Sequence, residues 1–421
     1  MKCLDETKLL PGDIILSTQD HYASKAIRKA TKSDISHAML YVSRGSVIDS
    51  TGEGVHARNT QRLFYDDDCA VYVRRLVANL SDKQRDTVIR YTRNRIGTRY
   101  STREAMRSAT GTNRLPSRQQ FCSRLIAQAY AAAGIDLLST PDFCTPDDVK
   151  NSPLLTAVPD AVIPVSDEHV ESVERDFDTN EIMREATNNL LNLARTRNRE
   201  IENLRDIDGY LVSNPSEDKS FAKFYEDSGY LTAWEVEFDK NRWQYELLLL
   251  IGMPGALEDK CAYCIGTIED HGDMVVRRDE NRVGYTILYD KYGIQTFAKL
   301  KALYERLVDL QVARRAVAIQ WLEQFAPEVV PGPANADSLM PHSDEWFAVL
   351  TRQNPQQAEF TRMFIERGGS REVCTFCGDS PAPNYRATGV TVQRDTILTA
   401  KLCDDCRGIR KAQFNEDYSP L

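Results

Sequence analysis

Short apolar runs separated by turn residues open the chain and predict a sheet of short strands. Residues 35–42 alternate between two faces, so His37 lies opposite the apolar residues that pack inward. A turn at Arg44 and Gly45 leads into residues 46–50, which we expect to pair antiparallel with the preceding strand. Further strands are predicted over residues 9–17, 55–57 and 70–76.

Helical periodicity follows these strands. Residues 81–96 predict a helix that Ser81 caps and that closes at Gly97. The polar loop 113–120 then gives way to an amphipathic run, which begins at Cys122. Cys122 is therefore expected in the first turn of a helix that packs on the sheet.

A cysteine in that position can be chemically active. The unpaired N–H groups and the dipole at a helix N-terminus stabilise a thiolate, and a nearby imidazolium lowers the pKa of the thiol further. Such a thiolate is a nucleophile for acyl chemistry. The alternative is a buried core thiol, because free cysteine is among the most buried residue types.

The rest of the chain has a different pattern. Residues 158–169 predict a polar linker, and residues 170–250 are charged, helical in spacing and rich in aromatic residues. We favour packing of a helical extension as the role of these aromatics over a cover for an active-site cleft. Residues 297–325 predict a long helix, and a proline-bearing linker follows over residues 326–343.

Two C-x-x-C pairs near the end of the chain predict a metal site. Cys374, Cys377, Cys403 and Cys406 can supply four thiolates to one tetrahedral ion, as in a zinc ribbon. A structural zinc is favoured over redox thiols. A catalytic zinc is not expected, because four thiolates close the coordination sphere.

A third C-x-x-C pair, Cys261 and Cys264, needs two more ligands. His271 is the nearest candidate and His342 is another. A nuclease of the His-Asn-His type can carry such a pair before Asp-His, but its further histidine is missing here. A second structural zinc, or an accessory pair on a partner's metal, is favoured.

Composition narrows the function classes. The chain has 421 residues, of which 42% are hydrophobic and 27% charged, and a net charge of −9, so nucleic acid is not an expected partner. No signal peptide is visible, and the longest apolar run, residues 247–253, is too short to cross a bilayer. Paired cysteines with these spacings suggest metal in a reducing compartment, so we expect a cytoplasmic protein. Three regions are predicted, over residues 1–157, 169–325 and 344–421.

Six stretches, in this order, resemble the permuted papain-like amidases of the NlpC superfamily, the YiiX and YaeF group. In that group the histidine strand precedes the cysteine helix, which is the reverse of papain. The stretches are Pro11-Gly12-Asp13-Ile14-Ile15, Ser36-His37-Ala38, Val47-Ile48-Asp49-Ser50, Gly97-Thr98-Arg99-Tyr100, Phe121-Cys122-Ser123-Arg124-Leu125 and Thr145-Pro146-Asp147-Asp148.

The resemblance implies an α+β fold, in which an antiparallel sheet of five or six strands packs against the cysteine helix. It also implies that Cys122 is the nucleophile and His37 the base. Two positions depart from the group, which often has glutamate where Asp49 stands and usually has glutamate where Arg124 stands. Arg124 lies within a turn of Cys122, so we expect it to affect substrate choice.

The third catalytic residue is predicted to be Asp49 rather than His56. Pairing about the turn carries Asp49 back alongside His37, where a carboxylate can accept the second imidazole N–H. The predicted function is cleavage of amide bonds in peptides by Cys122, His37 and Asp49 through an acyl-enzyme. The alternatives are a lipid thioesterase or acyltransferase, and a non-catalytic scaffold whose zinc and helical regions bind a protein partner.

Overall fold

The computed structural model describes residues 1–18, 25, 28–29, 31–43, 45–110, 116–327, 339–388, 397–414 and 416–421; at residues 82, 110, 269–276, 345, 348, 352 and 353 it describes the backbone alone. The chain forms two compact units. The first comprises Met1–Asn241 with Asn281–Glu305, and the second Arg242–Glu280 with Arg306–Leu421. Arg44 and most of the predicted linker at 326–343 lie outside the described residues.

The first unit is built on an antiparallel sheet. Six of the strands in the described part of the chain form it, in the order β5-β4-β3-β2-β6-β7, which confirms the predicted fold class. The strands β3, β4 and β5 are neighbours both in sequence and in the sheet, because two-residue connections join them. The strands are β2 (Ile14–Ser17), β3 (His37–Ser43), β4 (Ser46–Thr51), β5 (Gly54–Asn59), β6 (Val71–Leu76) and β7 (Leu155–Ala157).

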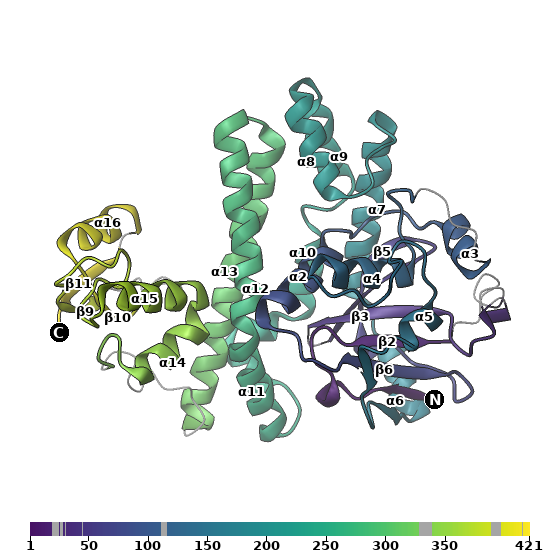
Figure 1. Cartoon of the computed structure of the whole chain (residues 1–421), viewed down its shortest axis with the longest axis horizontal. Coiled ribbons are helices and arrows are strands. Elements are labelled where there is room, and N and C mark those ends of the chain that lie inside the picture. Colours follow the sequence, from purple (N-terminus) through teal and green to yellow (C-terminus); the bar gives the residue numbers. More distant parts are fainter. Residues whose placement is uncertain are drawn as a thin grey trace. The chain divides into compact units, whose positions relative to one another are not determined.

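Helix α4 (Cys122–Ala132) packs across β3 and β4, with α2 (Asp82–Arg93) beside it (Figure 1). The apolar residues of β3 that alternate with His37 face α4 and share one core with Leu125 and Ile126. Burial of this face drives the helix onto the sheet. Ser81 caps α2 through a capping box with Gln84, as the sequence predicts. Two shorter helices, α3 (Thr102–Thr110) and α5 (Pro146–Lys150), flank α4 in sequence.

The predicted linker at 158–169 is folded. It contains β8 (Val162–Pro164), which pairs with β1 (Lys2–Leu4) at the very start of the chain, and it leads into α6 (Asp167–Arg175). The pairing was not visible in the sequence, because each strand is only three residues long. The predicted boundary between residues 157 and 169 therefore falls inside the first unit.

Helices follow from residue 167 to residue 325, in agreement with the predicted helical pattern. Their aromatic residues lie in helix–helix cores: Phe221 and Tyr225 are buried, and the rings of Tyr225 and Tyr230 lie 5.5 Å apart. The helices are α7 (Thr179–Arg197), α8 (Leu204–Ser213), α9 (Asp218–Asp227), α10 (Ala233–Lys240), α11 (Leu247–Gly252), α12 (Leu257–Tyr292) and α13 (Gln295–Phe325).

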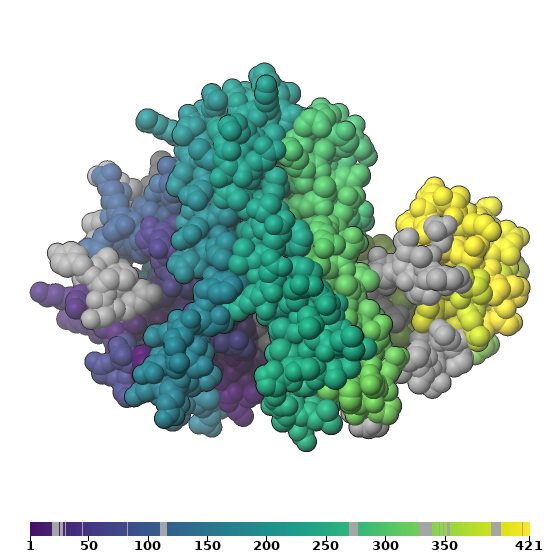
Figure 2. Space-filling model, turned by 180° about the vertical axis from the view of Figure 1, so that it is seen from behind, coloured from purple at the N-terminus to yellow at the C-terminus, as the bar shows by residue number. Residues whose placement is uncertain are grey.

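The predicted middle region, 169–325, is divided between the units. Its residues up to Asn241, with the stretch 281–305, belong to the first unit. Asp218 binds that stretch by accepting hydrogen bonds from the backbone and hydroxyl of Thr296, the latter at 2.7 Å. Figure 2 shows the teal helices α7 to α10 of this unit, seen from behind, as a continuous surface.

The second unit ends in a small mixed module. Among the described residues, β9, β10 and β11 form a three-stranded antiparallel sheet in the order β10-β9-β11. The core of the module buries Trp346, Leu402 and Tyr418. No helix in the described part of the chain combines the length and the apolar character needed to cross a membrane. The elements are α14 (Asp344–Gln353), α15 (Pro355–Gly368), β9 (Asn384–Thr388), β10 (Thr399–Lys401), α16 (Asp404–Phe414) and β11 (Asp417–Pro420).

Candidate active site

Cys122 is the first residue of α4, as the sequence predicts. Phe121 precedes it in an extended conformation, and no side chain caps the helix start. The first turn also contains no acidic residue. The N–H groups of this turn have no partner within the helix, so they and the helix dipole favour a negative charge at Cys122. The thiol itself is buried, with 4% of the residue exposed.

His37 lies between two of the predicted site residues. Its Nε2 lies 2.7 Å from Oδ2 of Asp49, and Cys122 is near enough to raise the pKa of the ring. With Nε2 directed at Asp49, Nδ1 is the nitrogen left for the thiol. Burial alone would lower the pKa of His37, but the hydrogen bonds and negative charges of Asp49 and Cys122 raise it to about 9. The imidazolium is therefore the stable form at neutral pH.

Asp49 lies on β4 directly opposite Met39 and is 1% exposed. Burial raises the pKa of its carboxyl, but His37 and Arg58 outweigh this effect and lower it. Arg58 donates from Nε to Oδ1 at 3.1 Å and from Nη2 to Thr51 at 3.4 Å. In Asp49, Oδ2 thus binds His37 and Oδ1 binds Arg58.

Arg58 is a site residue that the sequence reasoning missed. It lies on β5, two residues after His56, and His56 pairs directly with Asp49 across β4 and β5. Residues two apart on a strand share a face, so Arg58 reaches Asp49 diagonally. The register of the second hairpin, applied to residues 46–59, could have revealed it.

His56 also lies beside Asp49 in the sheet, but its hydrogen bond runs elsewhere. Its Nε2 donates to the carbonyl of Glu53 at 2.8 Å. Burial lowers the pKa of this ring, which keeps it neutral. The structure therefore brings His37, Asp49 and Cys122 together and gives His56 a turn-stabilising contact.

Arg124 differs from its sequence-based expectation. Its side chain is 0% exposed, so it is directed into the protein and not at a substrate. Nη1 donates to Glu104 and to the Gln119 carbonyl, both at 2.9 Å, and Nε donates to the Asp142 carbonyl at 2.8 Å. Arg124 therefore ties together the loops on either side of α4, and the buried ion pair replaces the expected influence on substrate choice.

The four cysteines at the end of the chain converge. The sulfurs of Cys374, Cys377, Cys403 and Cys406 all lie within 4.8 Å of one another. The Sγ atoms of Cys377 and Cys403 lie 3.6 Å apart, which is too far for a disulfide bond. This distance is close to the ~3.8 Å that tetrahedral geometry gives for two sulfurs on one zinc ion. Gly378, at φ 82°, makes the tight turn after the first pair. The cluster therefore fits a metal ion.

Cys261 and Cys264 have different surroundings. They lie within α12, where Cys264 is fully buried and both pack with apolar residues such as Val317 and Trp321. No third metal-ligating residue joins them among the side chains that the structure describes. Burial raises the pKa of Cys264 to about 12, which favours the neutral thiol. The predicted metal site at this pair thus has no support among these residues.

Of the two proposed partners of this pair, only His342 has a described side chain. The side chain of His271 lies outside the described residues. His342 is buried, and both ring nitrogens are engaged: Nδ1 donates to the Arg371 carbonyl at 2.9 Å, and Nε2 lies 3.0 Å from the Thr375 hydroxyl. His342 thus supports the turn that carries Cys374 and has no nitrogen left for a metal.

A helix that begins with a cysteine, packed on an antiparallel sheet whose histidine faces that cysteine, defines a papain-like hydrolase domain. The histidine strand comes first in the chain, so the domain is permuted. In agreement, residues 8–156 match the family described as permuted papain-like amidase enzyme, YaeF/YiiX, C92 family, which confirms the predicted resemblance. This is a cysteine peptidase and amidase family, and the match supports a domain with cysteine hydrolase activity.

A solved structure is similar to part of the chain. It is the crystal structure of metalloprotein yiiX from Escherichia coli O157:H7, with 23% sequence identity and a TM-score of 0.30. The similarity covers 36% of this chain and 97% of that chain. None of the curated proteins matches the chain.

Proposed function

We propose that the protein cleaves amide bonds in peptides or acyl-amides with Cys122 as nucleophile, His37 as acid and base, and Asp49 as the orienting carboxylate. The observation that carries the proposal is the position of His37, which binds Asp49 and has Cys122 close enough to affect its pKa. The elevated pKa of His37, about 9, keeps the imidazole protonated at neutral pH, so that it can give a proton to a departing amine.

In the proposed reaction the Cys122 sulfur attacks the carbonyl carbon and forms a tetrahedral intermediate. The C–N bond then breaks, and the His37 imidazolium gives its proton to the departing amine. A thioester between Cys122 and the acyl group remains. Water attacks this thioester and loses a proton to His37. The C–S bond then breaks and a carboxylic acid leaves, so that the Cys122 thiolate and the His37 imidazolium are restored.

Charge on the substrate oxygen needs donors during both attacks. The backbone N–H of Cys122, at the uncapped start of α4, is one such donor. Asp49 orients the imidazole and stabilises its charged form, as the third member of a triad does. Arg58 keeps that carboxylate ionised, because it pairs with the oxygen that His37 does not use.

We also propose that Cys374, Cys377, Cys403 and Cys406 hold a structural zinc ion. Four thiolates saturate tetrahedral zinc, so the ion would stabilise the fold of the module and would take no part in the hydrolysis. The proximity of the four sulfurs and the hydrogen bond from the Cys406 N–H to the Cys403 sulfur, at 3.4 Å, support it.

A thiol-directed activity probe tests the function. Acyl-amide, ester and thioester forms of one acyl group are offered in parallel to the full chain and to Cys122→Ala, and labelling is mapped by mass spectrometry. Selective labelling at Cys122 with turnover of the amide is expected. If only the thioester were turned over, the protein would be assigned as a thioesterase and not as an amidase. Equal behaviour of the full chain and the variant would refute a cysteine hydrolase and leave a scaffold.

A further inference from the structure

The connection between α7 and α8 contacts the part of the sheet domain that leads toward the nucleophile. We call residues 199–206 the α7–α8 corner. Glu202, 5% exposed, pairs with Arg99 through both carboxylate oxygens, and its Oε2 lies 3.0 Å from the Arg99 Nε. Asn203 donates to the Thr98 hydroxyl at 3.5 Å. A carboxylate that binds a guanidinium in this two-pronged way fixes orientation as well as position.

The same corner holds a second segment. Arg118 donates to the Glu200 carbonyl at 3.0 Å and to Oδ1 of Asp206 at 2.5 Å. Asp206 is itself fixed, because its other oxygen accepts the backbone N–H of Glu202 at 2.8 Å. Two stretches of the sheet domain, 97–99 and the loop before α4, are therefore anchored to one short piece of the helical extension.

These stretches meet next to Cys122. The N–H of Gln120 donates to the Arg99 carbonyl at 2.9 Å, and the N–H of Ser101 donates to the Gln120 carbonyl at 2.8 Å. Only Phe121 separates Gln120 from Cys122. A displacement of the Arg99–Ser101 segment is therefore passed by two hydrogen bonds to Gln120, the residue before the N-cap Phe121 of α4.

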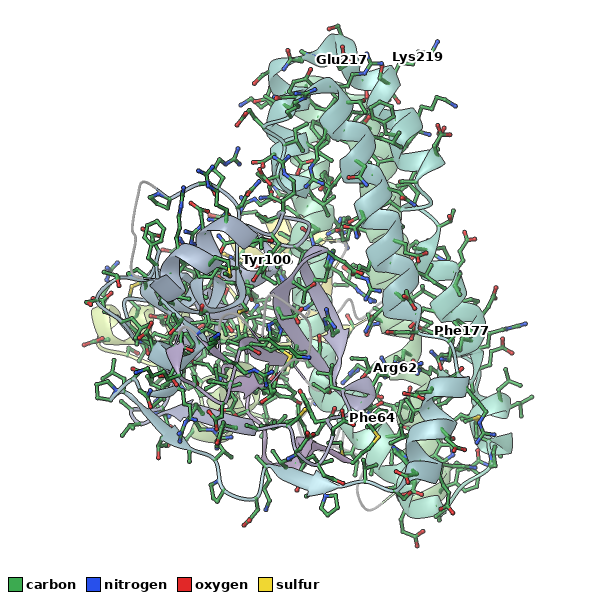
Figure 3. All side chains as sticks on the ribbon, turned by 90° about the vertical axis from the view of Figure 1, so that its right-hand side faces the viewer. Arg62, Phe64, Tyr100, Phe177, Glu217 and Lys219 are labelled. Atoms are coloured by element: carbon green, nitrogen blue, oxygen red, sulfur yellow. The ribbon has the colours of Figure 1, made fainter. Side chains whose placement is uncertain are left out.

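Tyr100 gives a second link to the segment that leads to the nucleophile. It pairs with Gln120 through an isolated parallel bridge, and it is labelled in Figure 3. Burial raises the pKa of its hydroxyl, and Cys122 raises it further. Arg99, which Glu202 binds, is thus the immediate neighbour of a residue that pairs with the stretch before α4.

The close fit of α7 beside this segment leaves little freedom. Gly97 is at φ +86°, and a Cβ there would lie 2.2 Å from Leu191 on α7. Its carbonyl accepts a hydrogen bond from Arg195 Nη2 at 2.9 Å. A segment bound at its backbone, hydroxyl and guanidinium has few alternative positions.

We propose that the α7–α8 corner is a working part of the active site, in which Glu202 and Asp206 are positioning residues that align the start of α4, and with it Cys122, against His37. This inference rests on the proposed function, since it assigns the helical extension a role in the reaction of Cys122. The corner acts through Arg99 and Arg118, and neither Glu202 nor Asp206 contacts the substrate.

The test compares alkylation of Cys122 by iodoacetamide in the full chain, Glu202→Gln and Arg118→Ala between pH 5 and 10, with Cys122 followed by mass spectrometry. We expect the rate at pH 7 to fall about 10-fold in each variant. The pH midpoint should rise by about one unit, because the thiolate loses its alignment with His37 and the helix start. A variant that only weakens the fold would melt earlier but keep the midpoint of the folded protein.

Arg175→Ala is the matched control. Arg175 is also an arginine of the helical extension, its side chain is 75% exposed, and its carboxylate partner, Glu171, lies on its own helix α6. It should keep the wild-type rate and midpoint. If Glu202→Gln does not fold, Arg118→Ala decides the question, because 56% of that side chain is exposed.

The outcomes separate the two proposals. Fast, selective alkylation of wild-type Cys122 with unchanged variants would overturn the role of the corner and leave the hydrolase standing. An unreactive wild-type Cys122 would instead overturn the proposed function. Where a substrate is available, the corner variants should lower kcat by about the same 10-fold and leave KM nearly unchanged.

Discussion

The surroundings of Cys122 and those of the four cysteines near the C-terminus differ in what lies next to the sulfur. Cys122 begins a helix and faces a histidine whose proton an aspartate retains. Each cysteine of the terminal cluster faces three other cysteines. A thiolate beside one imidazolium stays nucleophilic, whereas thiolates gathered around an ion become ligands. The residues around a cysteine therefore decide whether its sulfur acts as a nucleophile or as a structural metal ligand.

Cys261 and Cys264 extend the lesson. Their spacing is the same as that of Cys374 and Cys377, yet they lie on a helix and face an apolar core. Burial favours the neutral thiol at Cys264, and no third ligand joins the pair among the described side chains, so neither role is supported. The following expectations separate these environments in solution.

Removal of metal should have the largest effect. A strong chelator applied under reducing conditions should unfold the terminal module, because structural zinc sites contribute on the order of 10 kcal/mol to folding. Limited proteolysis, metal analysis and thiol titration of the treated protein would follow the change, with Cys374→Ser as the genetic equivalent. Alkylation of Cys122 should stay the same. A metal-free protein whose module resists protease would contradict the assignment.

Asp49→Asn should lower kcat by about 10³- to 10⁴-fold, because an amide at this position cannot stabilise the imidazolium or hold the right tautomer. The measurement is steady-state turnover, with circular dichroism to show that the fold is kept. His56→Ala is the matched control, since that ring lies beside the same carboxylate but binds Glu53. Near-full activity in Asp49→Asn together with loss in His56→Ala would reverse the assignment.

The pH dependence of activity and of metal content is the next largest expected difference between the Cys122 site and the terminal cysteine cluster. The pKa of His37, raised from 6.5 to about 9, predicts that kcat/KM falls as the pH rises through about 9, when the proton needed by the leaving group is lost. The same shift stabilises the fold fully below pH 6.5, and this contribution disappears as the pH rises through about 9.

In Asp49→Asn the basic limb should move to lower pH, because the charge and hydrogen bond that retain the proton are removed. A profile of kcat/KM between pH 6 and 10.5 checks both statements. A basic limb that is identical in the two proteins would show that another group controls it. Metal content of the terminal module should not change between pH 7 and 9, since the thiolates are already deprotonated when bound.

The smallest effect is expected for Cys264→Ala. It should lose about 1 kcal/mol of stability, because one buried atom is removed from a packed core. Its zinc content should equal that of the wild type, measured by atomic absorption per chain. A loss of one metal equivalent would restore the site predicted from the C-x-x-C spacing.

The sequence predicts the elements of the site better than their connections. A strand period, a tight turn and a helix start predict where His37, Asp49 and Cys122 lie, because each leaves a local pattern. The roles assigned to Cys122 and His37 come from the family resemblance. Arg58 was missed because its contact depends on the register of a second hairpin. The ion pair of Arg124 with Glu104 was missed for a similar reason, since it joins α4 to α3 across a loop.

The C-x-x-C spacing predicts a metal site both in the terminal module and in α12, but only the cysteines of the terminal module come together. In the terminal module a glycine turn and short strands bring two pairs together, while in α12 a continuous helix of 36 residues carries the pair. Nothing within the four letters of the motif distinguishes a turn from a helix. Likewise the three-residue strands β1 and β8 carry too little pattern to reveal their pairing.

That pairing bears on whether the hydrolase domain can be moved between proteins as a unit. A fragment that stops at Ala157 leaves the edge of β1 unpaired and uncovers the apolar residues that Ala161 and Val162 now cover, Leu4 and Leu9 among them. Exposed strand edges invite association with other chains. In Figure 3, Arg62 and Phe64 lie toward the segment between α6 and α7 that carries Phe177. There Arg62 donates to the Asp176 carbonyl at 2.6 Å. Gene fusion or recombination that cuts the chain at Ala157 would thus yield a domain that tends to associate with other chains. Transfer of the hydrolase domain to another protein is expected to succeed only with the helical extension included.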